Sequence, residues 1–229
     1  MAFISVAIAG GQISQFQSTH ASADPNALYT IWIGANDLDG IPAGSSSAAI
    51  AADIGAAVGH IDSAILTLAG MGAKNVLILT VPDLGKTPEA IAGGPATEAA
   101  ASALSAAFDN TLVNGGGGLP SLASLSSADS LDLSVLNTYA LLDAAVANPA
   151  NYGFTNVTQP CLTGEINYAG GTPCANPSQY LFWDELHPTA AGHSVVADAA
   201  LGLETPEPGT LSLVAGVLGM GLVLRRRRA

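Results

Sequence analysis

Five consecutive residues near the end of the chain, Asp184-Glu185-Leu186-His187-Pro188, include side chains that can move protons. An imidazole titrates close to neutral pH, so a histidine at this place can take a proton from a nucleophile. An aspartate three residues earlier can reach the other ring nitrogen across a tight turn and fix the tautomer. The competing interpretation is an aspartate that caps the next helix beside an incidental histidine. The pattern makes Asp184 and His187 candidate catalytic residues.

A second polar cluster, Gly34-Ala35-Asn36-Asp37, directly follows an apolar run at residues 27–33. Open α/β sheets place their functional sites at the carboxyl ends of their strands. A glycine lets the chain turn and approach a ligand closely, and an asparagine amide can stabilise a developing oxyanion by ~3 kcal/mol. The alternative is an ordinary turn, which asparagine and aspartate also favour. Gly34 and Asn36 are thus candidate oxyanion-binding residues.

Cys161 and Cys174 are the only two cysteines in the chain, and each follows a proline. In an exported protein, such a pair predicts one disulfide, which would stabilise the fold by about 3 kcal/mol. Metal binding would need further ligands nearby, and the sequence shows none. We therefore expect neither a metal site nor a cofactor.

Two short apolar runs, at residues 27–33 and 74–81, are rich in strand-forming residues and end at turn residues, which predicts buried strands. Between them, residues 45–71 carry apolar side chains at helical spacing. Such a strand–helix–strand unit builds a parallel sheet, so the expected class is α/β. The pattern further predicts helices at 95–112, 137–146 and 189–203, a weaker strand at 131–136 and a long loop at 151–180. His193 lies six residues after His187 and is expected on a different helix face.

The polar clusters resemble the conserved blocks of the GDSL, or SGNH, lipase and esterase family. The resemblance extends over residues 12–203 and rests on the segments at 23–29, 32–37, 81–85, 153–157 and 182–189. It implies a three-layer α/β/α, flavodoxin-like fold with a parallel sheet. It also implies ester hydrolysis, with a lipid or an acylated polysaccharide as substrate. In this family pattern Asn36 is an oxyanion donor, His187 is the base, and Asp184 orients that base.

The catalytic serine of that family belongs to a Gly-Asp-Ser block on the first strand. The 229 residues contain no Gly-Asp-Ser, and only 33 residues precede Gly34. We therefore expect a hydrolase-like domain at residues 1–203 that lacks the N-terminal strand, helix and export signal of the family. Two functions remain open. One is an esterase that is inactive as written, and the other is a non-catalytic surface or matrix-associated module that keeps the fold for binding or display.

The charge balance excludes one class of partner. The chain has 18 acidic and 6 basic side chains, and four of the basic ones are the arginines at 225–228. A body that carries only Lys74 and Lys86 as cations repels phosphate backbones, which excludes nucleic-acid binding. Hydrophobic residues make up 49% of the chain and charged residues 10%, a composition that argues against charge-driven disorder.

The C-terminal segment at 204–229 forms a second unit. Pro206-Glu207-Pro208 stops any preceding helix, residues 210–224 carry no charge, and the four arginines follow. This order resembles the PEP-CTERM sorting tail. The resemblance implies a short transmembrane helix with cytoplasmic arginines, and recognition by an exosortase-type enzyme. The alternative is a buried C-terminal helix with a basic tail.

The expected location follows from the tail. We expect an exported protein of the cell envelope or extracellular space that is anchored at the inner membrane before sorting. The first residues show no positively charged segment ahead of a short apolar stretch, so this sequence shows no signal peptide.

Overall fold

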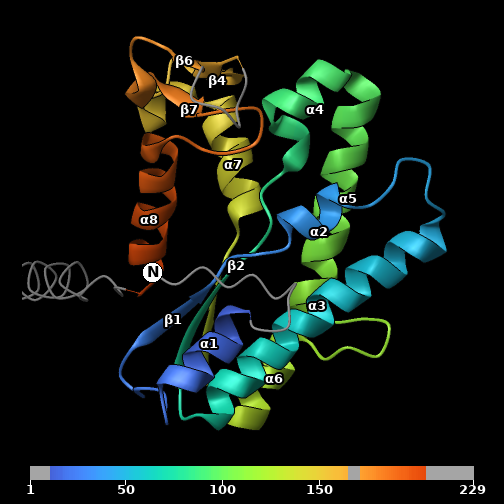
Figure 1. The fold of residues 1–229 in the computed structure, drawn as a ribbon, viewed down its shortest axis with the longest axis vertical. Coiled ribbons are helices and arrows are strands. Elements are labelled where there is room, and N and C mark those ends of the chain that lie inside the picture. Colours follow the sequence, from blue (N-terminus) through green and yellow to red (C-terminus); the bar gives the residue numbers. More distant parts are fainter. Residues whose placement is uncertain (1–10, 165–170, 205–229) are drawn as a thin grey trace, which may run out of the picture.

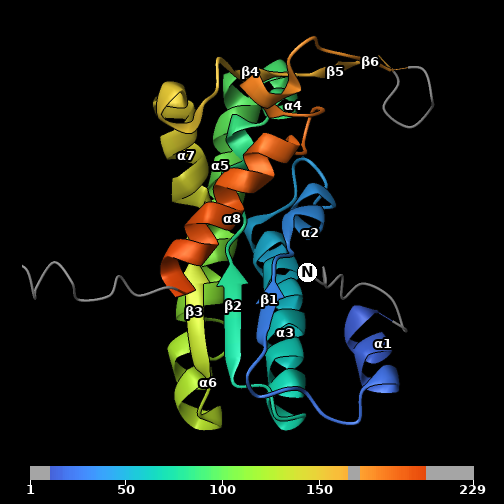
Figure 2. The same ribbon diagram turned by 90° about the vertical axis from the view of Figure 1, so that its left-hand side faces the viewer.

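A computed structural model describes residues 11–164 and 171–204, called here the described residues. Their centre is a parallel sheet (Figure 1), built from β1 (Leu28–Ile31), β2 (Asn75–Leu79) and β3 (Asp132–Leu136). The strand order is β1-β2-β3 (Figure 2). In the register of the sheet, Thr30 pairs with Leu77, and Leu77 pairs with Ser134. The strands predicted at 27–33, 74–81 and 131–136 are confirmed.

Helices cover both faces of this sheet (Figure 2). On one face lie α3 (Ser47–Gly70), α5 (Pro95–Asn114) and α6 (Leu122–Asp129), and on the other lies α8 (Ala190–Glu204). Alternate residues of β2 point to opposite faces, so Val76 and Ile78 join the core beneath α3 and α5, while Leu77 packs beside Val196 of α8. The predicted three-layer arrangement with a parallel sheet is confirmed.

The long helix α3 begins and packs as its sequence predicts. Ser46 caps it by accepting a hydrogen bond from the backbone N–H of Ala49 at 3.2 Å. Its inward face is fully buried at Val58 and Ile65, whose exposed fractions are both 0%. Within the described part of the chain, α3 alone is long and apolar enough to cross a bilayer, and packing against the sheet explains this apolarity. The transmembrane helix and sorting motif predicted beyond residue 204 lie outside the described residues.

Several short elements escaped prediction from the sequence. They are α1 (Gln12–Thr19), α2 (Ala35–Asp39), α4 (Pro88–Gly93), α6, and the 3₁₀ turns η1 (Leu84–Lys86), η2 (Pro149–Tyr152) and η3 (Pro177–Gln179). The predicted helix at 137–146 corresponds to α7 (Thr138–Ala147). α1 packs onto the sheet through an edge-to-face contact between Phe16 and Tyr29, with ring centroids 5.9 Å apart.

The prediction of one long loop at 151–180 is wrong in part. This region contains β4 (Asn156–Pro160), which pairs in parallel with β7 (Tyr180–Phe182), and β5 (Leu162–Thr163), which pairs antiparallel with β6 (Thr172–Pro173). The residues of β4 are mostly polar and partly exposed, so no apolar alternation marks the strand. Its partner β7 lies about 20 residues further along the chain, and only the folded backbone brings the two together.

Candidate active site

The turn after β1 depends on a glycine. Gly34 has a backbone φ of +120°, and a Cβ atom on it would lie 2.4 Å from Phe108 Cζ and 3.0 Å from Val81 Cγ2. No larger residue fits this position without displacing the Phe108 ring of α5. The Gly34 carbonyl accepts hydrogen bonds from the N–H groups of Asp37 and Leu38, both at 3.1 Å, which starts α2 at this point.

Asn36 lies in the short helix α2 and is exposed to solvent. Its backbone carbonyl accepts a hydrogen bond from Gly40 at 3.1 Å. Together with Ala35 and Trp32, Asn36 lines a cavity of about 500 Å³. Asn36, selected from the sequence as a candidate oxyanion donor, therefore lies on the wall of a cavity at the carboxyl end of β1.

Asp184 and His187 contact each other directly. His187 Nδ1 lies 2.9 Å from Asp184 Oδ2 and 3.0 Å from Oδ1. The same carboxylate accepts hydrogen bonds from the N–H groups of Leu186 at 2.9 Å and His187 at 2.6 Å. The Asp184 side chain is 9% exposed, whereas that of His187 is 71% exposed. A buried acceptor therefore binds one ring nitrogen and leaves Nε2 outside this contact.

The environment keeps Asp184 ionised. Burial alone would raise the pKa of its carboxyl group, but hydrogen bonds from the backbone of His187 and Leu186 and from the His187 ring outweigh burial and lower it below 3.8. A carboxylate that stays charged at neutral pH holds the Nδ1–H tautomer of the imidazole.

The segment that carries this pair is anchored through the backbone of β7. Trp183 N–H donates to the His187 carbonyl at 2.7 Å, and Thr189 N–H donates to Leu181 at 2.9 Å. The Thr189 hydroxyl also donates to the Tyr180 carbonyl at 2.7 Å. These bonds close the chain into a loop around Asp184 and His187, so their spacing does not depend on side-chain packing alone.

The predicted disulfide between Cys161 and Cys174 is confirmed. It lies next to the same anchoring strand, because Cys161 N–H donates to Phe182 at 3.0 Å and Leu162 N–H donates to Trp183 at 2.6 Å. The cross-link is thus connected through two backbone hydrogen bonds to the residues that immediately precede Asp184.

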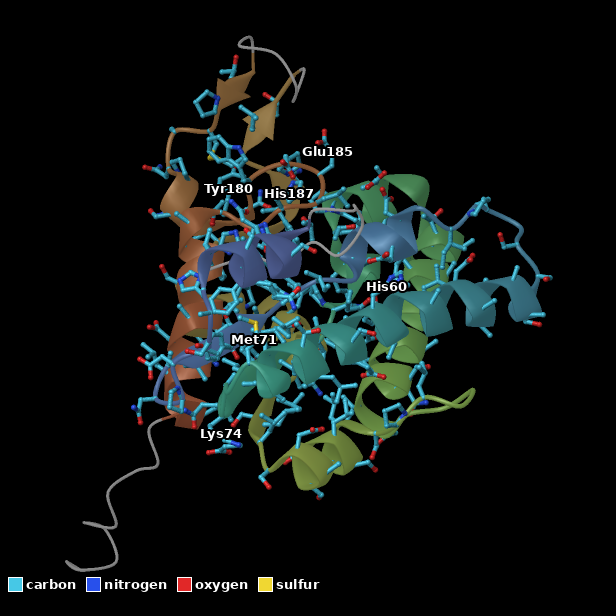
Figure 3. The ribbon with its side chains drawn as sticks, turned by 60° about the horizontal axis from the view of Figure 1, so that its bottom comes forward. His60, Met71, Lys74, Tyr180, Glu185 and His187 are labelled. Carbon is cyan, nitrogen blue, oxygen red and sulfur yellow. A yellow bond between two sulfur atoms is a disulfide. The ribbon has the colours of Figure 1, made fainter. Side chains whose placement is uncertain are left out.

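Asn36 and His187 line the same cavity although 150 residues separate them in the chain. α2, α4 and α5 supply one side of it, and α7 and α8 supply the other. In Figure 3 the labelled His187, Glu185 and Tyr180 lie in the upper part of the view, and His60 on α3 lies lower and to the right. In the described part of the chain the hydroxyl side chains on the cavity wall are threonines, Thr87, Thr97 and Thr138, and no serine lines it.

Sequence reasoning missed the place of His193. It lines the same cavity as His187, and its ring packs edge-to-face against Trp32 with centroids 6.0 Å apart. Burial, followed by the charge of His187, lowers its pKa below 6.5. Helical spacing does not apply to the two histidines, because α8, like the helix predicted at 189–203, begins only after His187. The proline at 188 was the signal that helical spacing does not apply there.

No group of three or more histidine, cysteine, aspartate or glutamate side chains that could hold a metal ion occurs among the described residues.

The chain is similar to known proteins. Residues 3–200 match the family model described as GDSL-like Lipase/Acylhydrolase. The chain belongs to this family. It is 34% identical over 193 residues to Esterase EstA of Pseudomonas aeruginosa, an overlap that covers 79% of this chain and 27% of that protein.

Proteins of lower identity to this chain are also similar. The thermolabile hemolysin of Vibrio parahaemolyticus is 26% identical over 186 residues, which cover 77% of this chain and 41% of the hemolysin. A GDSL esterase/lipase of Arabidopsis thaliana is 28% identical over 137 residues, which cover 55% of this chain and 36% of the plant protein. In each comparison the matched region is less than half of the relative. Membership of a lipase and esterase family, expected from the sequence motifs, is confirmed.

Proposed function

We propose that the cavity between Asn36 and His187 is the acyl-transfer site of an ester hydrolase. One observation carries this proposal: His187 contacts the ionised Asp184 through Nδ1 and lines the same cavity as Asn36. The names of family relatives, which include an esterase and esterase/lipases, support an ester as the substrate.

In the proposed reaction, His187 Nε2 takes the proton of a nucleophilic hydroxyl as that oxygen attacks the ester carbonyl. The Asn36 amide donates a hydrogen bond to the carbonyl oxygen as it becomes negative, an interaction worth ~3 kcal/mol. The protonated His187, stabilised by Asp184, then gives its proton to the departing alcohol. Water repeats the sequence on the acyl intermediate and releases the acid.

The 229 residues do not contain the nucleophile of this reaction in the Gly-Asp-Ser block that the family uses. They contain no Gly-Asp-Ser, and the described wall of the cavity carries no serine. We therefore propose that this polypeptide alone hydrolyses esters at the background rate. The same observation favours a second function, a non-catalytic surface module that binds esters in the cavity.

Restoring a nucleophile tests the hydrolase proposal. A family segment that ends in Gly-Asp-Ser, joined ahead of Met1, is expected to give hydrolysis of p-nitrophenyl butyrate that His187→Ala abolishes. The unmodified polypeptide and its His187→Ala variant are expected to match the uncatalysed rate. If the unmodified polypeptide is active and His187→Ala removes this activity, another hydroxyl serves as nucleophile and the proposed inactivity is wrong. If the restored protein is inactive although folded, the binding module is the better description.

We further propose that the protein is exported and anchored through residues 204–229, with an exosortase-type enzyme as partner. Export and anchoring are supported by the order of three features: the motif Pro206-Glu207-Pro208, an uncharged stretch and four arginines. Fusion of the segment to an exported reporter is expected to retain the reporter in the membrane fraction. A fully soluble fusion would overturn the proposal. Removal of the arginines should disturb the orientation of the anchor, because cytoplasmic positive charge sets it.

A further inference from the structure

A buried carboxylate lies where η1 meets α5. Asp83 directly precedes η1 and is only 1% exposed. Its Oδ1 accepts hydrogen bonds from the Gly85 N–H at 2.9 Å and from the Ser102 hydroxyl at 2.6 Å. A Cβ atom on Gly85 would overlap Ser102 Oγ and the Glu98 carbonyl, so this close approach of η1 to α5 requires a glycine. These contacts fix the position of the Asp83 carboxylate in the fold.

α7 places a second carboxyl group against the first. Asp143 forms a side-chain hydrogen bond with Asp83, and its Oδ1 is buried and accepts no hydrogen bond from the described residues. Two carboxyl groups can form a hydrogen bond only when one of them carries a proton. Donors such as the Gly85 N–H and the Ser102 hydroxyl favour the charged form of the carboxylate that accepts them. The proton of the pair therefore belongs to Asp143.

Three titratable groups face Asp143: Asp83 and Lys86 from the side of η1, and Tyr139 from α7 itself. Burial is the largest influence and raises the pKa of Asp143, the Asp83 carboxylate adds to this effect, and Lys86 acts in the opposite direction. Lys86 Nζ lies 3.9 Å from Asp83 Oδ2, and the lysine side chain is 40% exposed. This partly solvated cation reduces the repulsion within the pair without removing it. α5 faces the pair with the hydroxyl of Ser102.

The pair joins two walls of the cavity at the proposed site. Leu84 of η1 and Leu142 of α7 both line that cavity. η1 leads directly into α4, where the Glu89 N–H donates to the Glu185 carbonyl at 3.1 Å, next to Asp184. The contact between α7 and η1 is therefore continuous with the cavity wall and with the segment that carries the candidate catalytic pair.

We propose that the protonated Asp143 and the Asp83 carboxylate form a pH-sensitive latch, which holds α7 against η1 at acidic pH and releases it at alkaline pH. When the proton leaves to solvent, two buried negative charges remain in contact, and α7 moves away from η1 so that water can reach them. The α7 side of the cavity then becomes mobile. This inference rests on the proposed function only for the role of that cavity, and it adds a regulation of the site by pH.

Hydrogen exchange of the α7 amides in the full chain tests the latch. After correction for the pH dependence of the intrinsic exchange rate, we expect the protection of α7 (Thr138–Ala147) to fall about tenfold between pH ~5 and pH ~9. This change corresponds to the loss of one hydrogen bond to a charged group. The amides of β2 (Asn75–Leu79) are the internal reference, because local opening of α7 leaves the core strands closed.

Two variants test the role of the proton. Asp143→Asn supplies Asp83 with a donor that does not titrate, so its α7 protection should match the wild type at pH ~5 and exceed it about tenfold at pH ~9. Lys86→Gln removes the cation that lowers the pKa of Asp143, so it should move the release of α7 to higher pH. Asp53→Asn removes one negative charge at an exposed position of α3 and should behave like the wild type.

The outcomes separate the latch from the proposed function. The latch is overturned by α7 protection that does not depend on pH, by an equal fall in α7 and β2, or by a release that persists in Asp143→Asn. Release at lower pH in Lys86→Gln would also overturn it, and this variant decides the matter if Asp143→Asn does not fold. Hydrogen exchange needs no nucleophile, so selective release of α7 supports the latch even if the Gly-Asp-Ser fusion is inactive, a result that would count against the proposed function alone.

Discussion

A Cβ atom at residue 34 would lie 2.4 Å from Cζ of Phe108, so the end of β1 and the middle of α5 meet without room for a methyl group. Phe108 is completely buried, with an exposed fraction of 0%. This contact fixes where the chain turns from β1 into α2 and hence where Asn36 lies relative to the cavity. The glycine is needed both for its backbone φ of +120° and for its missing side chain.

Gly34→Ala is expected to lower the free energy of unfolding by about 2–4 kcal/mol, the sum of overpacking against Phe108 and an unfavourable φ. Gly44→Ala is the matched control, since Gly44 also has a positive φ, +81°, but its Cβ would meet nothing within 4 Å. The control should lose only the backbone contribution of ~1 kcal/mol. Urea unfolding of both variants measures the difference. Equal losses would show that the contact with Phe108 does not constrain this turn.

The helices and strands with a clear local pattern of apolar residues could be predicted from the sequence. α3 has apolar residues at helical spacing over many turns, and β2 is a run of buried apolar residues between turn signals. The strands β4 and β7 could not be predicted, because polar residues form β4 and its pairing is a long-range backbone contact. The same limit applies to the site. The contact between Asp184 and His187 is local and was predicted, whereas the place of His193 beside Trp32 depends on how α8 lies on the sheet.

Asp184→Asn is expected to alter the pH dependence of stability. The folded pKa of Asp184 lies below its unfolded value of about 3.8, so its charge stabilises the fold above that pH and the benefit disappears as the pH falls through the folded pKa. At pH ~7, replacing the charged acceptor should lower the free energy of unfolding by about 1–3 kcal/mol. As the pH falls from ~7 through the folded pKa of Asp184, the variant and the wild type should converge. A difference that stays constant over this range would mean that the asparagine acts through shape and not through charge.

Removal of the disulfide is expected to loosen the strand next to Asp184. The cross-link joins residues 13 positions apart, and loss of such a ring lowers stability by about 3 kcal/mol. For a chain of this size, the double variant Cys161→Ala/Cys174→Ala should unfold about 6–12 °C earlier. Reduction of the wild type should produce the same shift, and reduction of the double variant should change nothing. A double variant that melts like the oxidised wild type would contradict a stabilising role.

Asp109 gives the opposite pH dependence from Asp184. Its Oδ1 accepts a hydrogen bond from the Val81 N–H at 2.8 Å, while the buried Oδ2 has no hydrogen-bond partner among the described residues. Burial is the larger influence and raises the pKa to about 7, although the hydrogen bonds from Val81 and Thr80 act in the other direction. The folded state therefore holds a proton that the unfolded chain loses near pH ~4. Its contribution to stability is complete below that pH and is lost as the pH rises through about 7.

Asp109→Asn keeps an oxygen for the Val81 N–H and removes the titrating charge. At pH ~8 it should raise the free energy of unfolding by about 1–3 kcal/mol, since one pKa unit corresponds to ~1.4 kcal/mol and partial solvation reduces the effect. At pH ~4, where the wild-type carboxyl group is already protonated in the fold, the gain should be close to zero. Asp53→Asn, at an exposed position of α3, is the control for removal of one negative charge from an acidic protein. Thermal unfolding of the wild type and both variants at the two pH values tests this prediction. The buried carboxyl group is not the source of the added stability if Asp109→Asn stabilises the fold as much at pH ~4 as at pH ~8. The same conclusion follows if Asp53→Asn gives an equal increase.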